Sequence, residues 1–254
     1  SEFSYLESPC FNFTNAEYPV FSFDYLINTE NNIDGLRLEY STNDGAIWDS
    51  VPKNLNHNLN WCTKNVSALS SVGWSGSSGT SYVTAKTLLP ASVIGKDKVK
   101  FRFVFASDDN NVLEGVAIDN IKIYELPYDV GIKRLVTPIS GCYIGNNVKL
   151  TTKIKNIGYR PLKSGLKVPI EIKLRTENVV KDTLVVGSLV AQNDSISFTT
   201  TGTFNIFTKG LHNLRLNTNF TPELNRANDT LKTTLQVRGI PGYTLGPDKA
   251  VTVD

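Results

Sequence analysis

Histidine, the commonest acid–base catalyst, occurs only twice in this sequence, as His57 and His212. The two histidines fall in different predicted domains, so they cannot form a local pair. The sequence also lacks a His-Glu-x-x-His zinc motif and a phosphate-binding glycine motif. Residues 73–77, GWSGS, miss the nucleophile-elbow pattern at their last position and lead into a strand rather than a helix. These absences predict a protein that is not an enzyme.

Long apolar runs and blocks of one charge are absent as well. No run is long enough to span a bilayer, and the start lacks the basic and apolar stretches of a signal peptide. The net charge of +2 comes from interspersed acidic and basic residues, so neither nucleic acid nor an anionic membrane is indicated as a partner. Residues 239–254 follow the last predicted strand, and we expect them to be a linker or the start of a following module.

Methionine is absent and cysteine occurs three times. Cys10 and Cys62 both fall in the first half of the chain. In an exported protein they form either a disulfide or two free thiols, because the sequence does not give the geometry that a disulfide requires. Cys142 is expected to be a small buried hydrophobic residue.

Apolar residues that alternate with polar ones are abundant, and this period of two is typical of a half-buried strand. In the stretch 98–105, Val99, Phe101, Phe103 and Phe105 occupy every second position, and Lys98, Lys100 and Arg102 lie between them. No segment of the first 126 residues has a helical period. Further strands of the first half are predicted at residues 21–27, 36–41 and 82–89.

The strand predicted at residues 116–124 changes its buried face midway. Val116 and Ile118 occupy even positions, whereas Ile121 and Ile123 occupy odd ones. Successive strand residues point to opposite faces, so the pattern predicts either a β-bulge at residues 119–120 or burial on both faces.

A domain boundary is predicted at residues 126–129, where one apolar strand ends and a new set of alternations begins. The second half then has about seven strands with the spacing of an immunoglobulin-like sandwich. The predicted strands of this half include residues 147–156, 165–175, 183–190, 194–200, 211–217 and 230–237. The sequence therefore predicts an all-β chain with domains at residues 1–126 and 129–238.

Several short motifs of the first half resemble the MAM-like, concanavalin-type jelly roll. They are Ser8-Pro9-Cys10, residues 21–25 (FSFDY), Glu39-Tyr40-Ser41 before Asp44-Gly45 and Trp48, residues 73–76 (GWSG), and residues 114–120 (EGVAIDN). The resemblance covers residues 1–126 and implies a jelly-roll β-sandwich of the kind found in secreted and surface proteins of the Bacteroidetes.

The second half resembles the CARDB-type, immunoglobulin-like adhesion modules that often follow such a jelly roll. The matching residues are 140–142 (SGC), 148–158, 222–225 (PELN) and Asn228-Asp229. Such pairs occur in type IX-secreted adhesins, including gliding-motility adhesins, and as ancillary modules of secreted peptidases. The resemblance therefore implies an extracellular location at the cell surface.

Acidic residues of the first half are candidates for a structural calcium site. Ca²⁺ prefers six to eight oxygen ligands, which loops supply through carboxylates and carbonyls. MAM-like jelly rolls often hold a cation near the residue that matches Asp119. The alternative is that residues 108–111 form a solvated loop and that Asp119 is hydrogen-bonded at a bulge. The candidate ligands are Asp24, Asp34, Asp108, Glu114 and Asp119.

Aromatic side chains are candidates for carbohydrate binding, because a ring face is an apolar platform for the C–H groups of a sugar. Trp48 and Trp74 are expected in the sandwich core. Trp61, in an Asn-rich loop, and Tyr82 are the candidates for exposure and for contact with a surface polysaccharide or an extracellular substratum.

Four positions match the Asp-Ser/Thr-apolar pattern that Bacteroidetes use to attach O-glycans to exported proteins. About one match is expected by chance from this composition. The alternative is turn chemistry, since Asp before Ser or Thr commonly starts a strand. The candidate glycan sites are Ser50, Thr183, Ser195 and Thr230.

These features together predict a jelly-roll β-sandwich followed by an immunoglobulin-like β-sandwich, cut from a long cell-surface adhesin. Its partners would be a surface ligand and neighbouring β modules of the same chain. A rival interpretation is a pair of ancillary carbohydrate- or substrate-binding modules of a secreted hydrolase or peptidase. A third is a structural spacer without a ligand.

Overall fold

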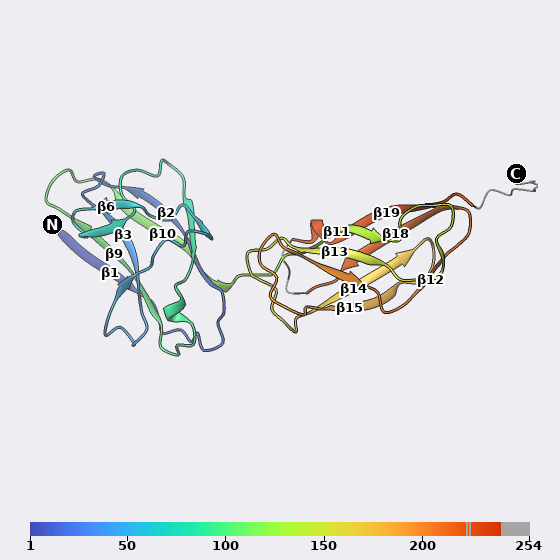
Figure 1. Ribbon diagram of the computed structural model, residues 1–254. Coiled ribbons are helices and arrows are strands. Elements are labelled where there is room, and N and C mark those ends of the chain that lie inside the picture. The colour runs from blue at the N-terminus through green and yellow to red at the C-terminus, as the bar shows by residue number, and fades with distance from the viewer. Residues whose placement is uncertain (222, 224, 240–254) are drawn as a thin grey trace, which may run out of the picture. The chain divides into compact units, whose positions relative to one another are not determined.

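The computed structural model describes residues 1–221, 223 and 225–239, and the chain divides into two compact units, Ser1–Leu126 and Pro127–Asp254. Both units are built from antiparallel strands, apart from two short 3₁₀ turns (Figure 1). The predicted all-β, β-sandwich fold is confirmed. Within the described residues, no helix has the length and apolarity that a membrane crossing requires. Residues 240–254 of the expected linker (239–254), and Pro222 and Leu224 of the CARDB-like motif, lie outside the described residues.

The first unit contains two four-stranded sheets. One sheet has the order β1-β9-β3-β4, formed by Glu2–Glu7, Lys100–Ser107, Gly35–Ser41 and Asp49–Ser50. The other has the order β10-β2-β8-β5, formed by Gly115–Glu125, Pro19–Asn28, Val83–Leu88 and Asn58–Leu59. Strands β1 and β10 are therefore edge strands, one in each sheet.

Aromatic rings fill the space between these two sheets. Phe23 lies at its centre, with its ring centroid 4.8 Å from that of Phe103 and 5.1 Å from that of Trp74. Phe21 and Phe101 are also buried, and their ring centroids are 4.9 Å apart. The alternation predicted for residues 98–105 thus places its phenylalanines in this core, although Phe105 is only half-buried.

The change of buried face in the predicted strand 116–124 corresponds to a β-bulge in β10. Pairing with β2 shifts register between Asp119 and Lys122, and Asn120 has a φ of 50°. The prediction of a bulge is confirmed. As an edge strand, β10 is nevertheless more exposed than its apolar sequence suggests, and Ile121 is 50% exposed.

A short hairpin covers part of the outer face of the first sheet. Strands β6 (Lys64–Val66) and β7 (Ser71–Gly73) place Val66 and Leu69 over Val104 and Ala106 of β9 in a small second core. The Asn-rich segment 54–65, expected to be a loop, contributes β5 and the start of this hairpin. Strands β5, β6 and β7 are only two or three residues long, which is too short to show an alternating pattern in the sequence.

The second unit is a separate sandwich. Its four-stranded sheet has the order β15-β14-β18-β19, formed by Val180–Val185, Lys167–Leu174, Gly210–Thr218 and Thr230–Val237. A three-stranded sheet has the order β11-β13-β16, formed by Val130–Thr137, Thr151–Asn156 and Ser195–Thr199. Strands β12 (Gly145–Val148) and β17 (Phe204–Ile206) pair separately. The fully buried core includes Leu150, Ile154, Ile170, Ile172, Leu174 and Ile206.

Candidate functional sites

Three carboxylates meet at one end of the first sandwich. One oxygen each of Glu30, Asp34 and Asp108 lies within 4.8 Å of the other two. Glu30 and Asp34 come from the turn between β2 and β3, and Asp108 follows β9. The Asp34 carboxylate is buried and accepts a hydrogen bond of 2.9 Å from the Asp108 backbone N–H, which joins the two loops.

The turn that carries Glu30 and Asp34 is fixed by a buried serine. The Ser75 hydroxyl contacts the backbone carbonyl oxygens of Glu30 at 3.1 Å and Asp34 at 2.6 Å. Two backbone N–H groups, from Ile33 and Asp34, also bond the Glu30 carbonyl oxygen. The positions of the carboxylates are therefore set by backbone contacts before any ligand is bound.

The donor set of this acidic cluster fits a calcium ion. Glu30 Oε2 is buried without a hydrogen-bond partner, and none of the three carboxylates has an ion-pair partner among the described residues. A cavity of about 180 Å³ beside Asp34 and Asp108 is also lined by Glu114, Asn28 and Asn110. Carboxylate and amide oxygens are the hard ligands that Ca²⁺ prefers.

The structure brings only some of the predicted ligands together. Asp34 and Asp108 lie in the cluster, and Glu114 lines the adjoining cavity, where its carboxylate accepts a hydrogen bond from Asn28. Glu30 also lies in the cluster, but it was not among the ligands predicted from the sequence. A signal was present, because Glu30 lies four residues before Asp34 in one Asn-rich turn.

Asp24 and Asp119 are placed elsewhere, opposite each other on β2 and β10. Asp24 accepts hydrogen bonds from Thr84 (2.6 Å) and Asn120 (2.8 Å), and these lower the pKa of its carboxyl group, Thr84 contributing most. Asp119 accepts a hydrogen bond of 2.6 Å from the Asn120 backbone N–H. Both carboxylates are thus satisfied at the bulge, which matches the alternative interpretation of Asp119.

The tryptophans lie differently from the expectation at two of three positions. Trp61 is buried, with its ring centroid 4.9 Å from that of Trp74 and its indole N–H donating to the Val51 carbonyl at 3.2 Å. The prediction that Trp61 is exposed is wrong, because the Asn-rich loop turns this ring into the core. Trp74 is buried as predicted. Trp48 is wrongly predicted in the core, and Tyr82 is exposed as expected.

Trp48 instead belongs to a row of planar groups on the outer face of the sheet β1-β9-β3-β4, which we call the ring row: Phe3, Tyr5, Arg102 and Trp48. The Arg102 guanidinium carbon lies 4.3 Å from the Trp48 ring centroid and 5.3 Å from that of Tyr5. Glu39, which is buried, accepts a hydrogen bond of 2.6 Å from Arg102 Nε and also pairs with Arg37. Phe3 is 62% exposed and Tyr5 is 59% exposed.

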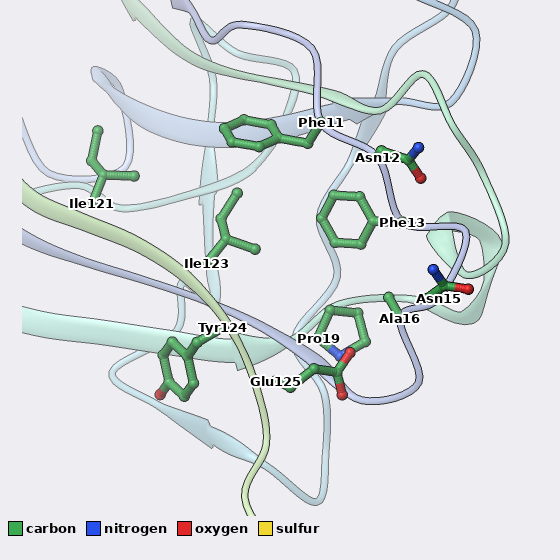
Figure 2. Close-up of a pocket in the computed structure, with 10 residues that line it drawn as sticks. All are labelled: Phe11, Asn12, Phe13, Asn15, Ala16, Pro19, Ile121, Ile123, Tyr124 and Glu125. Carbon is green, nitrogen blue, oxygen red and sulfur yellow. The ribbon is translucent and has the colours of Figure 1, made fainter.

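A cavity of about 570 Å³ forms an apolar groove on the first unit (Figure 2). Phe11 and Phe13 of the loop after β1 form one side, and Ile121, Ile123 and Tyr124 of β10 form the other. A second cavity of about 260 Å³ shares Phe11, Ile121 and Ile123 and reaches Leu6, Phe21, Phe101 and Phe103. The groove exists because both sheets end here in edge strands, so apolar side chains reach the surface.

Polar groups lie at the rim of the apolar groove. Asn12 and Asn15 are on one side, and Glu125 is on the other (Figure 2). The Glu125 carboxylate accepts hydrogen bonds from the backbone N–H groups of Glu17 (2.8 Å) and Tyr18 (2.9 Å). These bonds tie the loop that forms one wall to the end of β10, so the groove is held open.

All three cysteines are free thiols in the structure. The disulfide between Cys10 and Cys62 is not formed, since Cys10 is exposed whereas Cys62 is buried among the rings of the core. Burial raises the pKa of the Cys62 thiol to about 12. Cys142 is exposed, so the prediction that it is buried is wrong.

The four candidate glycan sites differ in accessibility. Ser50, Thr183 and Ser195 are exposed. The Thr230 hydroxyl donates to Asn217 at 2.6 Å, and Asp182 accepts bonds from the backbone N–H groups of Thr183 and Thr201 at 2.7 Å each. Asp182 lies within β15 and its contact with Thr201 spans 19 residues, so it does not begin a turn, and O-glycosylation at all four positions stays a prediction.

No family model matches this chain, and no curated protein matches it. The resemblance to MAM-like and CARDB-type modules therefore stays a prediction. Similar solved structures include the adhesin domain of Epf from Streptococcus pyogenes, at 11% identity and a TM-score of 0.37, covering 94% of this chain and 72% of that one. Another is a GH2 β-galacturonidase from Eisenbergiella tayi, at 10% identity and a TM-score of 0.25, covering 92% and 35%. These likenesses are remote, and no functional argument rests on them.

Proposed function

We propose that this chain is a non-catalytic segment of a large cell-surface adhesin, located outside the cell, and that the first unit makes the adhesive contact. The observation that carries the proposal is the apolar groove with its polar rim. A large apolar cavity with a few polar groups is the usual form of a binding site. Ile121 is 50% exposed and Tyr124 is 37% exposed at this groove, so contact with an apolar substratum would remove their surface from water. Attachment during gliding motility is one use of such a contact.

Replacing both Ile121 and Tyr124 by serine should weaken adsorption of the 254-residue protein to alkyl-coated glass by about tenfold or more. Burial of one large apolar side chain contributes roughly 1.5–3 kcal/mol, and about half of each is available here. The measurement is the adsorption isotherm at fixed salt, with the melting temperature of each variant as a check on folding. Leu55→Ser is the matched control, because Leu55 is 87% exposed on another loop. An equal loss in this control would contradict a specific role for the groove.

We further propose that the acidic cluster of Glu30, Asp34 and Asp108 holds a structural Ca²⁺ ion. The three carboxylates would supply ligands, and amide oxygens and water would complete the shell. The ion would neutralise negative charges that are now close together, and it would pin the loops after β2 and β9. Its role would be stability rather than chemistry, because the cluster is fixed by backbone contacts at the end of the sandwich.

The ring row supports a second candidate function, carbohydrate binding as an ancillary module of a secreted hydrolase or peptidase. Two exposed rings, Phe3 and Tyr5, share one face of β1, and Tyr5 lies beside the Arg102 guanidinium group that Glu39 holds in place. A sugar could stack on the rings while the guanidinium donates hydrogen bonds to its hydroxyl groups. Since these groups are already ordered, little conformational entropy would be lost on binding.

Tyr5→Ala should reduce binding to a neutral polysaccharide by about fivefold to tenfold if the ring row is a sugar site, because stacking on one aromatic ring contributes about 1 kcal/mol. Retardation in gels that contain soluble mannan or hydroxyethyl cellulose would measure this. Tyr82→Ala is the control, since Tyr82 is 50% exposed but lies outside the row. Equal retardation of all three proteins in every gel would rule this site out for these sugars.

A further inference from the structure

The charge of the chain is divided unequally between its two units. Residues 1–126 contain nine Lys and Arg against 15 Asp and Glu, whereas residues 127–254 contain 17 against nine. The small net charge of the whole sequence therefore hides an acidic first unit and a basic second unit. A domain with a strong excess of one charge attracts partners of the opposite charge.

Strand register concentrates three of the basic residues in one line. In the sheet β15-β14-β18-β19, Lys173 lies directly opposite Arg215, and Arg215 lies directly opposite Lys232. All three side chains are exposed. Adjacent strands are about 4.8 Å apart, so the three cations cross about 10 Å of the sheet. We call these three residues the cation row.

Nothing in the described part of the chain neutralises the cation row. No ion pair or hydrogen bond to a carboxylate involves Lys173, Arg215 or Lys232. Glu171, the nearest acidic residue on β14, pairs in register with Lys181 of β15. Like charges directly opposite each other destabilise a sheet, so this arrangement has an energetic cost that a bound anion would remove.

The cation row also lines a cavity. A hollow of about 450 Å³ is bounded by the row together with Arg175, Asn213 and Thr234, and no carboxylate lines it. Arg175 is held in place, because its Nε donates to His212 at 2.9 Å and its Nη2 donates to Thr208 at 2.9 Å. Amide and hydroxyl groups therefore lie beside four cations on one face.

We propose that this face of the second unit binds an acidic polysaccharide. Successive carboxylate or sulfate groups of such a chain would lie across the three strands on the cation row. Asn213 and Thr234 would bond its hydroxyl groups. A glycan is favoured over single-stranded nucleic acid because no aromatic ring lines the cavity, and such sites usually stack bases on aromatic rings. This proposal concerns a different unit from the groove and the ring row, and it does not depend on either.

The test is binding of the full 254-residue protein to hyaluronate and to dextran sulfate, with uncharged dextran as the comparison. We expect binding to the acidic chains alone, and a steep loss of affinity as salt rises, because each neutralised anion releases a counterion. Arg215→Glu should lower the affinity by at least tenfold. Leu55→Ser, on the first unit and outside both the groove and the ring row, should leave it unchanged.

Lys155→Glu is the matched control, since Lys155 lies on β13 of the other sheet and the substitution changes the net charge equally. A loss in this variant as large as in Arg215→Glu would mean that general charge attracts the polymer, and the proposal would fail. It would also fail if DNA bound better than both acidic polysaccharides, or if neither acidic polysaccharide bound at low salt.

Discussion

Millimolar Ca²⁺ is expected to raise the melting temperature of the first unit by about 10 °C over its value in EDTA. A ligand at 100 times its dissociation constant stabilises the folded state by about 2.7 kcal/mol, and about 4 °C per kcal/mol applies to a unit of this size. All three tryptophans, Trp48, Trp61 and Trp74, lie in the first unit. Tryptophan fluorescence of the intact chain therefore reports this transition alone.

Two substitutions in the acidic cluster should each reduce the stabilisation by calcium, and one of them should also stabilise the calcium-free protein. The oxygens of the acidic cluster lie within 4.8 Å of each other, so each pair of charges repels by at least about 0.9 kcal/mol in water and at least about 3.5 kcal/mol at an effective dielectric constant of 20. Glu30→Gln should therefore raise the melting temperature in EDTA and reduce the gain from calcium. Asp34→Asn should also reduce the gain from calcium, because it removes a ligand charge.

The control for calcium is Asp119→Asn, because sequence reasoning included Asp119 among the ligands and the structure places it at the bulge of β10. Its calcium shift should equal that of the unchanged protein. If the calcium-induced rise in melting temperature disappears in Asp119→Asn but persists in Asp34→Asn, the calcium site lies at the bulge. If calcium gives no shift, or Mg²⁺ gives the same one, the proposal of a calcium site in the acidic cluster is wrong.

Local patterns predicted the fold well because they report on single strands. The alternation at 98–105 and the change of face at 119–120 are properties of a few consecutive residues, and both have counterparts in β9 and β10. The acidic cluster is harder to predict, since Asp108 is 74 residues from Asp34 and their contact depends on how the loops pack. Exposure of Trp61 was predicted wrongly for the same reason, as polar neighbours in sequence do not determine where a ring points.

The cation row could be predicted from the sequence only in part. Counting charge for each predicted domain would have revealed the basic second unit. Placing Lys173 opposite Arg215 requires the register between β14 and β18, which is set by turns and side-chain packing far from these residues. Alternation therefore predicts which residues face outward, whereas their neighbours across the sheet come from the structure.

Stability of the second unit is expected to fall as pH rises from about 5 to 8, because of one buried acid. Glu223 is 7% exposed, and its pKa is raised from 4.5 to about 8, mainly by burial and further by the charges of Asp229 and Asp129. One of its oxygens accepts a hydrogen bond from the Val130 backbone N–H, and Oε2 is buried with no donor. In the folded unit this carboxyl group is therefore protonated at neutral pH, and a side-chain hydrogen bond with Asp129 further favours the protonated form.

Stability falls with pH because the folded and unfolded states bind different numbers of protons. Between pH 4.5 and 8 the unfolded chain has lost this proton and the folded unit has kept it, so stability falls by up to about 1.4 kcal/mol per pH unit. Below pH 4.5 both states are protonated, and above pH 8 both are ionised, so this contribution becomes constant at each end. Calorimetry of the intact chain should show the dependence in the transition that tryptophan fluorescence does not report.

Glu223→Gln should remove this pH dependence and make the second unit more stable than the unchanged protein at pH 9. The amide oxygen can still accept from the Val130 N–H, and the amide N–H₂ can donate to Asp129 in place of the proton. Glu223→Ala should instead destabilise the unit at every pH, by about 1–3 kcal/mol, because the buried Val130 N–H loses its acceptor. Glu177→Gln, an exposed control on the same unit, should retain the original slope. If the slope persists in Glu223→Gln, another group is responsible and the assignment to Glu223 is wrong.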